Sequence, residues 1–541
     1  MLERILRSPD GRLTLVEGPE SESLHANRDV LELAAGLAGR LRAQGVMPGT
    51  RVCIAAPTSL ESLVAILAAW MNGAAVAVLP SEPGSRYLSA EEFLSMLDYA
   101  RPAALIASDA VCERLGGNRP ECSVVPAREA LLCRSPLDRV AWTPRRPDDP
   151  AILQFTSGST GSPKAVVITH AMLAHSCEAV RRRAQVDERD IVVSWLPLHH
   201  DMGMSVLTAA WWCGARHTVL IPTSAFARRP LLWLETIARF RASLSPAPMF
   251  AYALIARLGR ALVDADLDLS SWRYAWVGAE PVFERHLREF REAVRALGMP
   301  ETALQPAYGM AESVVAVSMG EAGRAYRLLH IDRVGLFLHN RARPVGPDSA
   351  GAVVYVSNGA PVEGMQACVF SERGERLEEL QVGRICVRGP SVMRAYFGDA
   401  QARHPSDWFD TGDLGFLHCG EIFVTGRRKD LIIRAGVNIN PHLIEWAAES
   451  HLGLRSGRSV AFSHLDAAAG REEIVVVVGM QPQAPQAEHV RADLARELAR
   501  RVGVQIDRIV FVRGSSIPQT TSGKVRRGRI KADYARGALP A

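Results

Sequence analysis

Short apolar runs alternate with segments of helical periodicity over the first half of the chain. Each run has four or five residues, many of them β-branched, and this predicts buried strands. Strands that alternate with helices favour α/β layers built on largely parallel sheets. The strands expected on this basis are residues 51–55, 103–106, 151–155, 165–169, 191–194 and 217–221.

The pattern changes in the second half of the chain. Strands and turns dominate residues 346–388, which predicts a small β subdomain with strands at 352–356 and 384–388. A charged run at 427–430 then precedes a compact α+β tail with a strand at 473–478. We therefore expect an α/β fold, with a large N-terminal domain of layered subdomains and a small α+β domain at the C-terminus.

Composition narrows the class of protein. Hydrophobic residues make up 48% and charged residues 22% of the chain, as in soluble globular proteins. The most apolar stretch, residues 62–79, is interrupted at Asn72-Gly73 and is expected to form a helix, a turn and a strand rather than a membrane span. The net charge of +5 comes mostly from scattered arginines without interleaved aromatic residues, so nucleic-acid binding is not expected.

Cysteine usage indicates a reducing compartment. The nine cysteines are odd in number, are widely spaced and include no C-x-x-C pair. This favours free thiols over a disulfide framework or a zinc site. The N-terminus lacks the apolar segment of a signal peptide, and we expect a cytoplasmic protein.

A loop of hydroxyls and glycines stands between two predicted strands, in the sequence Phe-Thr-Ser-Gly-Ser-Thr-Gly-Ser-Pro-Lys at 155–164. Backbone N–H groups and hydroxyls of such a loop can bind a polyphosphate, and its lysine adds a positive charge. The glycine spacing and the proline before the lysine differ from a Walker loop. The residues expected to bind ATP phosphates are Thr156, Ser157, Gly158, Ser159, Thr160, Gly161 and Lys164.

Four further motifs follow in order. They are Tyr-Gly-Met-Ala-Glu at 308–312, Phe-Asp-Thr-Gly-Asp at 409–413, Gly-Arg-Arg-Lys-Asp at 426–430 and Thr-Ser-Gly-Lys at 521–524. Together with the phosphate loop they resemble the adenylate-forming superfamily, which includes acyl-CoA synthetases, luciferases, adenylation domains and fatty acyl-AMP ligases. The resemblance extends from about residue 25 to about residue 530.

The resemblance implies a division of the chain at a hinge. An N-terminal domain, 1–426, would hold the acyl and ATP sites, and residues 427–431 would form the hinge, with Lys429 at the pivot. A mobile C-terminal domain, 432–541, would carry the catalytic Lys524. A lysine on a Ser-Gly turn suits a group that enters the site in only one domain orientation.

The resemblance also implies roles in forming an acyl-adenylate, in which a carboxylate attacks the α-phosphorus of ATP and pyrophosphate leaves. Tyr308 would offer a ring to adenine, Asp413 would accept hydrogen bonds from the ribose, and Arg427 would reach a ribose or phosphate oxygen. Glu312 would bind Mg²⁺, and Lys524 would bridge the carboxylate and the α-phosphate. The remaining residues expected to line the nucleotide pocket are Gly278, Ala279, Glu280, Gly309, Met310 and Ala311.

One segment, 194–204, most resembles the fatty acyl-AMP ligase branch through its Trp-Leu-Pro and His-Asp-Met-Gly sequences. In that branch an extra segment, here 330–345, restrains the C-terminal domain and disfavours coenzyme A as acceptor. Asn438 also replaces an arginine common in CoA synthetases. The expected acceptor is the phosphopantetheine arm of an acyl carrier protein.

The acyl pocket is expected to contain His200, Asp201, Met202, Gly203, Met249 and Trp276. Trp276 and Met249 depart from the branch pattern, so the length of the acid stays open. His200 either gates the acyl channel or orients the carboxylate as a catalytic residue, or it is only a hydrogen-bonded residue at a helix start beside Asp201. Asp201 lies thirteen residues before Gly214, the offset of the substrate aspartate in amino-acid adenylation domains.

These patterns predict an enzyme that uses ATP and Mg²⁺ to activate a carboxylic acid, expected to be a fatty acid. It would load the acid onto a carrier protein and prime polyketide, nonribosomal peptide or lipid synthesis. The alternatives are an acyl-CoA ligase, a stand-alone amino-acid adenylating enzyme and, in another class, a catalytically silent adenylate-binding regulator.

Overall fold

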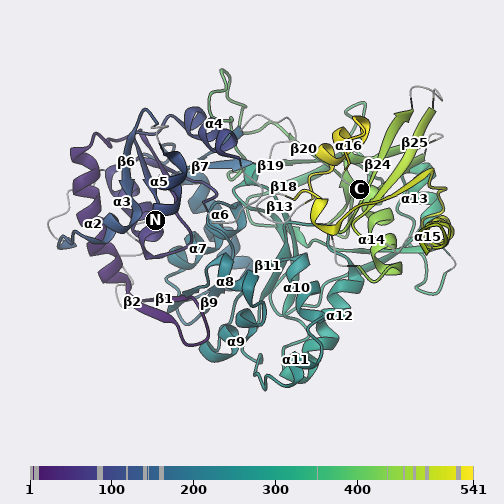
Figure 1. Cartoon of the computed structure of the whole chain (residues 1–541), viewed down its shortest axis with the longest axis horizontal. Helices are drawn as coiled ribbons and strands as arrows, with labels where there is room; N and C mark the ends of the chain where they lie inside the picture. Colours follow the sequence, from purple (N-terminus) through teal and green to yellow (C-terminus); the bar gives the residue numbers. More distant parts are fainter. Residues whose placement is uncertain are drawn as a thin grey trace.

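The computed structural model describes residues 4, 11–81, 89–116, 120–137, 143, 145–156, 164–349, 351–434, 437–454, 457–466, 471–481, 486–519 and 525–539. These residues form layered α/β units, followed by a smaller α+β unit at the C-terminal end (Figure 1). The fold class expected from the sequence is confirmed.

A six-stranded sheet with the order β6-β5-β3-β4-β7-β8 forms the first layer. Its strands pair in parallel except for β7 and β8, which are antiparallel. Val52 and Ile54 of β3 belong to the core that includes α2 and α3, whereas Cys53 and Ala55 belong to the core with α4 and α5. Both faces are therefore covered, and the strands are apolar throughout. The elements are α2(Asn27–Ala43), β3(Arg51–Ala55), α3(Leu60–Asn72), β4(Ala75–Val78), α4(Ala90–Ala100), β5(Ala104–Ala107), α5(Asp109–Leu115), β6(Ser123–Pro126), η1(Ala127–Leu131), β7(Pro150–Thr156) and β8(Lys164–Thr169).

The apolar stretch 62–79 has the predicted helix–turn–strand structure. Helix α3 ends at Gly73, whose φ of +80° is left-handed, and β4 follows directly. No helix in the described ranges is long and apolar enough to cross a membrane.

A second sheet has the order β2-β1-β10-β9. The sequence analysis missed β1 and β2, which precede the first helix. Strand β1 pairs in parallel with β10, far along the chain, and the two are joined by the 2.8 Å Thr14–His217 hydrogen bond. The elements are β1(Arg12–Val16), β2(Glu22–Ala26), α6(His170–Ala184), β9(Ile191–Ser194), α7(Asp201–Cys213), β10(His217–Leu220), α8(Thr223–Arg228) and α9(Leu231–Phe240).

A third sheet has the order β11-β12-β13-β14-β17, and among the predicted site residues it carries Trp276, Gly278, Tyr308 and Gly309. Strands β11 to β13 are parallel, and β13, β14 and β17 are antiparallel. The elements are β11(Ala247–Pro248), α10(Met249–Ala256), α11(Arg260–Val263), β12(Ala275–Gly278), α12(Glu284–Val294), η3(Arg295–Leu297), β13(Leu304–Gly309), η4(Ala311–Ser313), β14(Ala316–Met319) and β17(Ala360–Pro361).

The predicted β subdomain at 346–388 is only partly correct, because its two strands belong to different sheets. Strand β16(Ala352–Val356) pairs with β15(Leu328–Asp332), next to α13(Arg333–His339). Strand β19(Gly383–Arg388) belongs to a sheet with β18(Gln366–Phe370), β20(Phe409–His418) and β21(Glu421–Arg427). The β region therefore continues to Arg427, and it was missed because β20 lacks regular apolar alternation.

The C-terminal unit has its own core, since two apolar clusters consist only of residues from Ile432 onward. It meets the N-terminal part through the stacked rings of Phe283 and Trp446 and through hydrogen bonds from Arg257 to the Leu454 carbonyl and from Arg333 to the Arg501 carbonyl. The elements are η5(Arg428–Asp430), β22(Ile432–Arg434), β23(Val437–Ile439), α14(Pro441–His451), β24(Ser459–Asp466), β25(Arg471–Val478), α15(Ala487–Val502), β26(Arg508–Phe511), η7(Gly514–Ser516) and α16(Arg527–Ala535). The predicted hinge 427–431 spans the end of β21 and η5; rotation about it stays a prediction.

Candidate active site

Tyr308, Asp413 and Arg427 come together from three strands. Asp413 on β20 and Arg427 on β21 are cross-strand partners, and Arg427 Nε lies 3.2 Å from Asp413 Oδ1. Tyr308, at the end of β13, donates its hydroxyl to Asp413 Oδ2 at 2.7 Å. Burial, followed by the adjacent Asp413 carboxylate, raises the pKa of Tyr308 well above its usual value, so the phenol stays a hydrogen-bond donor.

These residues face a cavity of about 510 Å³ between the N-terminal and C-terminal units, within the size range of small-molecule sites. One wall comes from α10, β13, β16, β20 and β21, and the other comes from α14 and neighbouring segments of the C-terminal unit. The predicted site residues that line it are Met249, Ala279, Glu280, Tyr308, Gly309, Asp413 and Arg427.

Two tight turns shape the cavity wall. A Cβ atom on Gly309 would lie 1.6 Å from the Val315 carbonyl oxygen, so only glycine permits this close approach before Met310 and Ala311. Ala279 follows Gly278 with a φ of +63°, and Glu280 accepts a 2.9 Å hydrogen bond from the Phe250 amide. The turn at 278–280 is thereby fixed to the start of α10.

A second group of predicted residues lies where β7 and β8 meet. Thr156 and Lys164 are paired across the two strands, and Lys164 Nζ lies 5.5 Å from the centre of the Tyr396 ring. The Tyr396 hydroxyl donates to Glu312 Oε1 at 2.8 Å. Lys164 and Glu312 therefore share one aromatic neighbour. The predicted phosphate-loop residues Ser157, Gly158, Ser159, Thr160 and Gly161 lie outside the described residues.

Tyr396 was missed by the sequence analysis. It occupies the irregular segment between β19 and β20, and its partner Glu312 lies 84 positions away. No local pattern marks such a residue, because the contact depends on how distant segments meet.

The start of α7 holds four of the predicted acyl-pocket residues. His200 is the residue before the helix, and its Nδ1 lies 2.7 Å from Asp201 Oδ1, which also accepts a hydrogen bond from the Met202 amide at 2.7 Å. A Cβ atom on Gly203 would lie 2.2 Å from the Pro197 carbonyl oxygen. The contact to Asp201 is the one expected for a helix-start histidine, and a catalytic role for His200 stays a prediction.

The neighbouring His199 was not anticipated. Its Nε2 is buried and has no hydrogen-bond partner among the residues that the structure describes, and burial lowers the pKa of the imidazole to about 3. The ring is therefore neutral near pH 7. The His199 carbonyl accepts a 2.8 Å hydrogen bond from Gln154 on β7, which ties the α7 segment to the strand before the phosphate loop.

Met249 and Trp276 occupy different cavities. Met249, at the start of α10, faces the large cavity. Trp276, on β12, faces an apolar cavity of about 40 Å³ together with Val206, Ala210 and Tyr274. The structure thus places the indole against α7, in a space suited to an apolar group.

The segment after the predicted hinge contacts a largely buried arginine that the sequence analysis did not single out. Arg527 Nη1 bonds Asp430 Oδ2 at 2.8 Å, and its Nη2 bonds both oxygens of Glu445, at 2.7 and 2.9 Å. The predicted hinge residue Lys429 precedes Asp430, and desolvation followed by the charge of Arg427 lowers the pKa of Lys429. Lys524 lies outside the described residues, as does the side chain of Asn438.

Comparison with known proteins identifies relatives that cover most of the chain. A family model described as "AMP-binding enzyme" matches residues 15–397. The chain is 31% identical over 563 residues to the long-chain-fatty-acid–AMP ligase FadD32 of Mycolicibacterium smegmatis, covering 93% of this chain and 88% of the relative. It is 34% identical over 411 residues to the medium-chain-fatty-acid–[acyl-carrier-protein] ligase JamA of Moorena producens, covering 72% and 69%.

A solved structure from studies of fatty acyl-adenylate ligases from E. coli and L. pneumophila superposes with a TM-score of 0.90 at 30% identity. The similarity covers 99% of this chain and 97% of that one. It therefore includes the C-terminal unit as well as the N-terminal layers.

Proposed function

This chain belongs to the AMP-binding enzyme family, and we propose that it is a fatty acyl-AMP ligase that transfers its acyl group to an acyl carrier protein. The observation that carries the proposal is the contact of Tyr308 and Arg427 with the Asp413 carboxylate on the wall of a cavity of about 510 Å³. The relatives named as a fatty-acid–AMP ligase and a fatty-acid–carrier-protein ligase support the choice of acid and acceptor.

The reaction brings two anions together, so the protein must neutralise charge and align the reactants. Asp413 is suited to accept hydrogen bonds from the ribose hydroxyls, with Tyr308 and Arg427 holding its carboxylate in place. Lys164 and the loop before it are suited to the β- and γ-phosphates. Lys524 would bridge the attacking carboxylate and the α-phosphate.

Glu312 is the residue that would hold Mg²⁺. One of its oxygens accepts the Tyr396 hydroxyl, and a carboxylate with about four lone-pair sites can still bind a cation. Magnesium prefers one or two carboxylates together with phosphate oxygens and water, and Glu312 beside the Lys164 segment fits that donor set. When bound, the ion would supply charge neutralisation to the phosphates.

The segment 330–345 supports a carrier protein as acceptor. It includes the end of β15 and all of α13, and Arg333 donates a 2.8 Å hydrogen bond to the Arg501 carbonyl at the end of α15. This contact joins the segment directly to the C-terminal unit. By restraining the movement of that unit, the segment would disfavour coenzyme A as acceptor.

The amino-acid alternative is less well supported. The thirteen-residue offset from Asp201 to Gly214 is the length of α7, which Gly214 ends with a left-handed φ of +67°. The Asp201 carboxylate is engaged by His200 and by the Met202 amide. That environment accounts for the aspartate without a substrate ammonium group.

ATP–pyrophosphate exchange with a panel of carboxylic acids tests the proposal. Exchange with a fatty acid but not with amino acids would support it, and no exchange with any acid would favour a silent adenylate-binding regulator. Adding coenzyme A or a phosphopantetheinylated carrier protein, with mass spectrometry of the products, would identify the acceptor. Because all nine cysteines are free, we place the enzyme in a reducing compartment, the cytoplasm.

A further inference from the structure

We propose that Glu379, His418 and Cys419 form a binding site for Zn²⁺, separate from the ligase site. Within the described ranges these residues form a group whose ligand atoms lie within 4.8 Å of one another. Thiolate, imidazole and carboxylate are the donors that zinc takes in proteins. The cysteine pattern of the sequence did not suggest such a site, because the third donor comes from a distant loop.

The geometry between Cys419 and His418 suits one shared ion. Cys419 Sγ lies 3.5 Å from His418 Nε2. Zinc–sulfur and zinc–nitrogen bonds of about 2.3 and 2.05 Å, at a tetrahedral angle, separate the two ligand atoms by about 3.6 Å. Both atoms can therefore bind one ion almost without moving.

Glu379 is held beside this pair. Its Oε2 accepts a 3.0 Å hydrogen bond from the Cys419 amide, and its Oε1 accepts a 3.3 Å hydrogen bond from the Gly420 amide. Oε2 also lies 3.4 Å from His418 Nδ1, a contact just short of hydrogen-bond geometry. A small shift would let the carboxylate accept a hydrogen bond from Nδ1 and orient the ring so that Nε2 faces the ion, as carboxylates do at zinc–histidine sites, or let it bind the ion itself.

The turn between β20 and β21 has a cysteine at a position where cysteine is unusual. Cys419 and Gly420 link β20 to β21 with φ values of +50° and +74°, the signs of a type I′ turn, where Asn-Gly or Asp-Gly is the usual choice. A cysteine in the left-handed region is disfavoured, and such local exceptions gather at functional positions. The turn therefore holds the Cys419 thiol at the surface, although the left-handed backbone conformation is unfavourable for cysteine.

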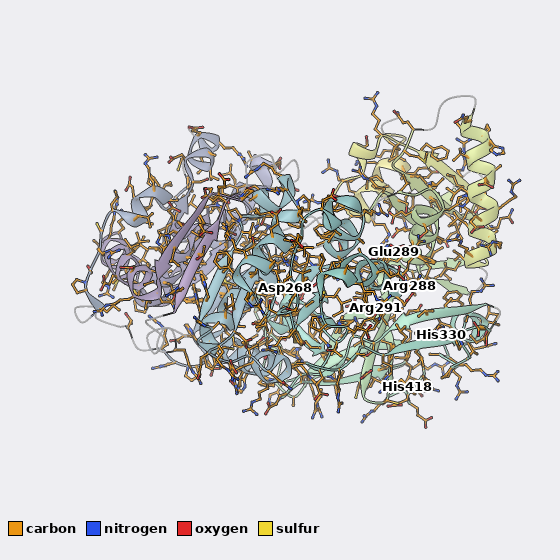
Figure 2. The ribbon with its side chains drawn as sticks, turned by 90° about the horizontal axis from the view of Figure 1, so that it is seen from below. Asp268, Arg288, Glu289, Arg291, His330 and His418 are labelled. Carbon is orange, nitrogen blue, oxygen red and sulfur yellow. The ribbon has the colours of Figure 1, made fainter. Side chains whose placement is uncertain are left out.

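The surrounding structure is rigid enough to present a site. The rings of Phe416 and Phe423 stack beneath the turn with centroids 5.0 Å apart, and the Leu380 amide donates to the Leu417 carbonyl at 2.9 Å, which fixes the Glu379 loop to β20. His418 lies at the edge of the molecule away from the C-terminal unit (Figure 2). Asp413 occupies the opposite half of β20, so an ion at the turn would not touch the nucleotide cavity.

Binding of Zn²⁺ at this site releases one proton to solvent. The Cys419 thiol loses its proton to solvent as the sulfur–zinc bond forms, and His418 binds through a neutral Nε2. Water would complete the coordination on the exposed side.

The test uses the full-length, reduced, metal-free protein titrated with Co²⁺ and then with Zn²⁺. Wild type should take up one Co²⁺ with thiolate-to-cobalt absorption, and Zn²⁺ should displace it. Cys419→Asn, which suits the turn better than cysteine, should abolish the band, and Glu379→Gln should weaken binding about 10–100-fold. Cys133→Ser is the matched control, because Cys133 is also exposed, and should behave like wild type.

Three results would overturn the proposal: no thiolate band in the wild type, an unchanged band in Cys419→Asn, or a band lost in Cys133→Ser. Alkylation resolved by peptide mass spectrometry gives a second readout. Zn²⁺ should slow alkylation of Cys419 and leave Cys133 unaffected. Equal alkylation of Cys419 with and without Zn²⁺ would also exclude the site.

Discussion

The Tyr308 hydroxyl donates a 2.7 Å hydrogen bond to Asp413 Oδ2 across 105 positions of the chain. Both groups are buried on the cavity wall, and Arg427 contacts the other carboxylate oxygen. The tyrosine therefore holds the carboxylate proposed to bind ribose, in addition to offering its ring to adenine.

Tyr308→Phe should lower kcat/KM for ATP. The substitution keeps the ring and removes one hydrogen bond to a charged group, which contributes about 1.5–3 kcal/mol. Steady-state kinetics with ATP as the varied substrate would measure the loss. Tyr274→Phe is the control, since that hydroxyl donates to the Gly320 carbonyl away from the nucleotide cavity. Equal kinetics in the two variants would contradict the role.

Lys524→Ala should lower the rate of acyl-AMP formation about 10²–10³-fold, the effect of removing one donor that stabilises developing charge. ATP binding should be largely retained. Pyrophosphate exchange measures the first property and equilibrium nucleotide binding the second. Lys531→Ala, in the exposed part of α16, should be close to wild type. Near-normal exchange in Lys524→Ala would remove the lysine from the mechanism.

Arg333→Ala should increase the use of coenzyme A relative to a carrier protein, because it removes the hydrogen bond from the 330–345 segment to the Arg501 carbonyl. Quantifying acyl-CoA and acyl-carrier products by mass spectrometry checks this. Arg341→Ala changes an exposed residue of the same segment and should leave the ratio unchanged. Unaltered CoA use in both variants would mean that the restraint lies elsewhere.

Trp276→Ala should move the preferred acid toward longer chains. The indole borders the apolar cavity of about 40 Å³, and its removal would open space next to α7. Each extra buried methylene contributes about 0.8 kcal/mol, so kcat/KM should rise several-fold per added carbon until the new space is filled. Trp276→Phe should give a smaller shift. A wild-type optimum at long chains, unmoved by either substitution, would exclude Trp276 from the pocket.

Relative to wild type, Glu449→Gln should raise the free energy of unfolding more at pH 8 than at pH 5. Burial, followed by the Glu445 charge, raises the pKa of Glu449 to about 8. Its carboxyl accepts hydrogen bonds from the Arg458 and Ser459 amides. Between the unfolded pKa near 4.5 and the folded pKa, the folded state holds a proton that the unfolded state has lost, so wild-type stability falls as pH rises.

Urea unfolding at pH 5 and pH 8 checks this prediction. Between these pH values the free energy of unfolding of the variant should fall less than that of the wild type, because the variant lacks the titration of Glu449. Burial alone would raise the pKa of Glu445, but the charges of Arg527 and His442 outweigh it and lower this pKa to about 2. The contribution of Glu445 is therefore lost only in stronger acid, outside that window. The same pH dependence in wild type and variant would show that Glu449 is not the group responsible.

The sequence alone was sufficient for the fold class and for the motifs, because both depend on local patterns. Short apolar runs predicted β3, β4, β5, β7 and β8 of the first sheet, though not β6, and helical spacing followed by an apolar run predicted the passage from α3 to β4. The motifs identified Tyr308, Asp413 and Arg427 one by one, since each stands in a short characteristic string.

Only the tertiary structure decided which residues meet. The bonds of Tyr396 to Glu312 and of Arg527 to Asp430, and the approach of Glu379 to Cys419, join segments that no local pattern connects. Strand β1 was missed because its place depends on β10, far along the chain, whereas β20 was missed because it lacks regular apolar alternation. Residue type and spacing therefore determined what chemistry is available, whereas packing between distant elements determined where that chemistry is assembled.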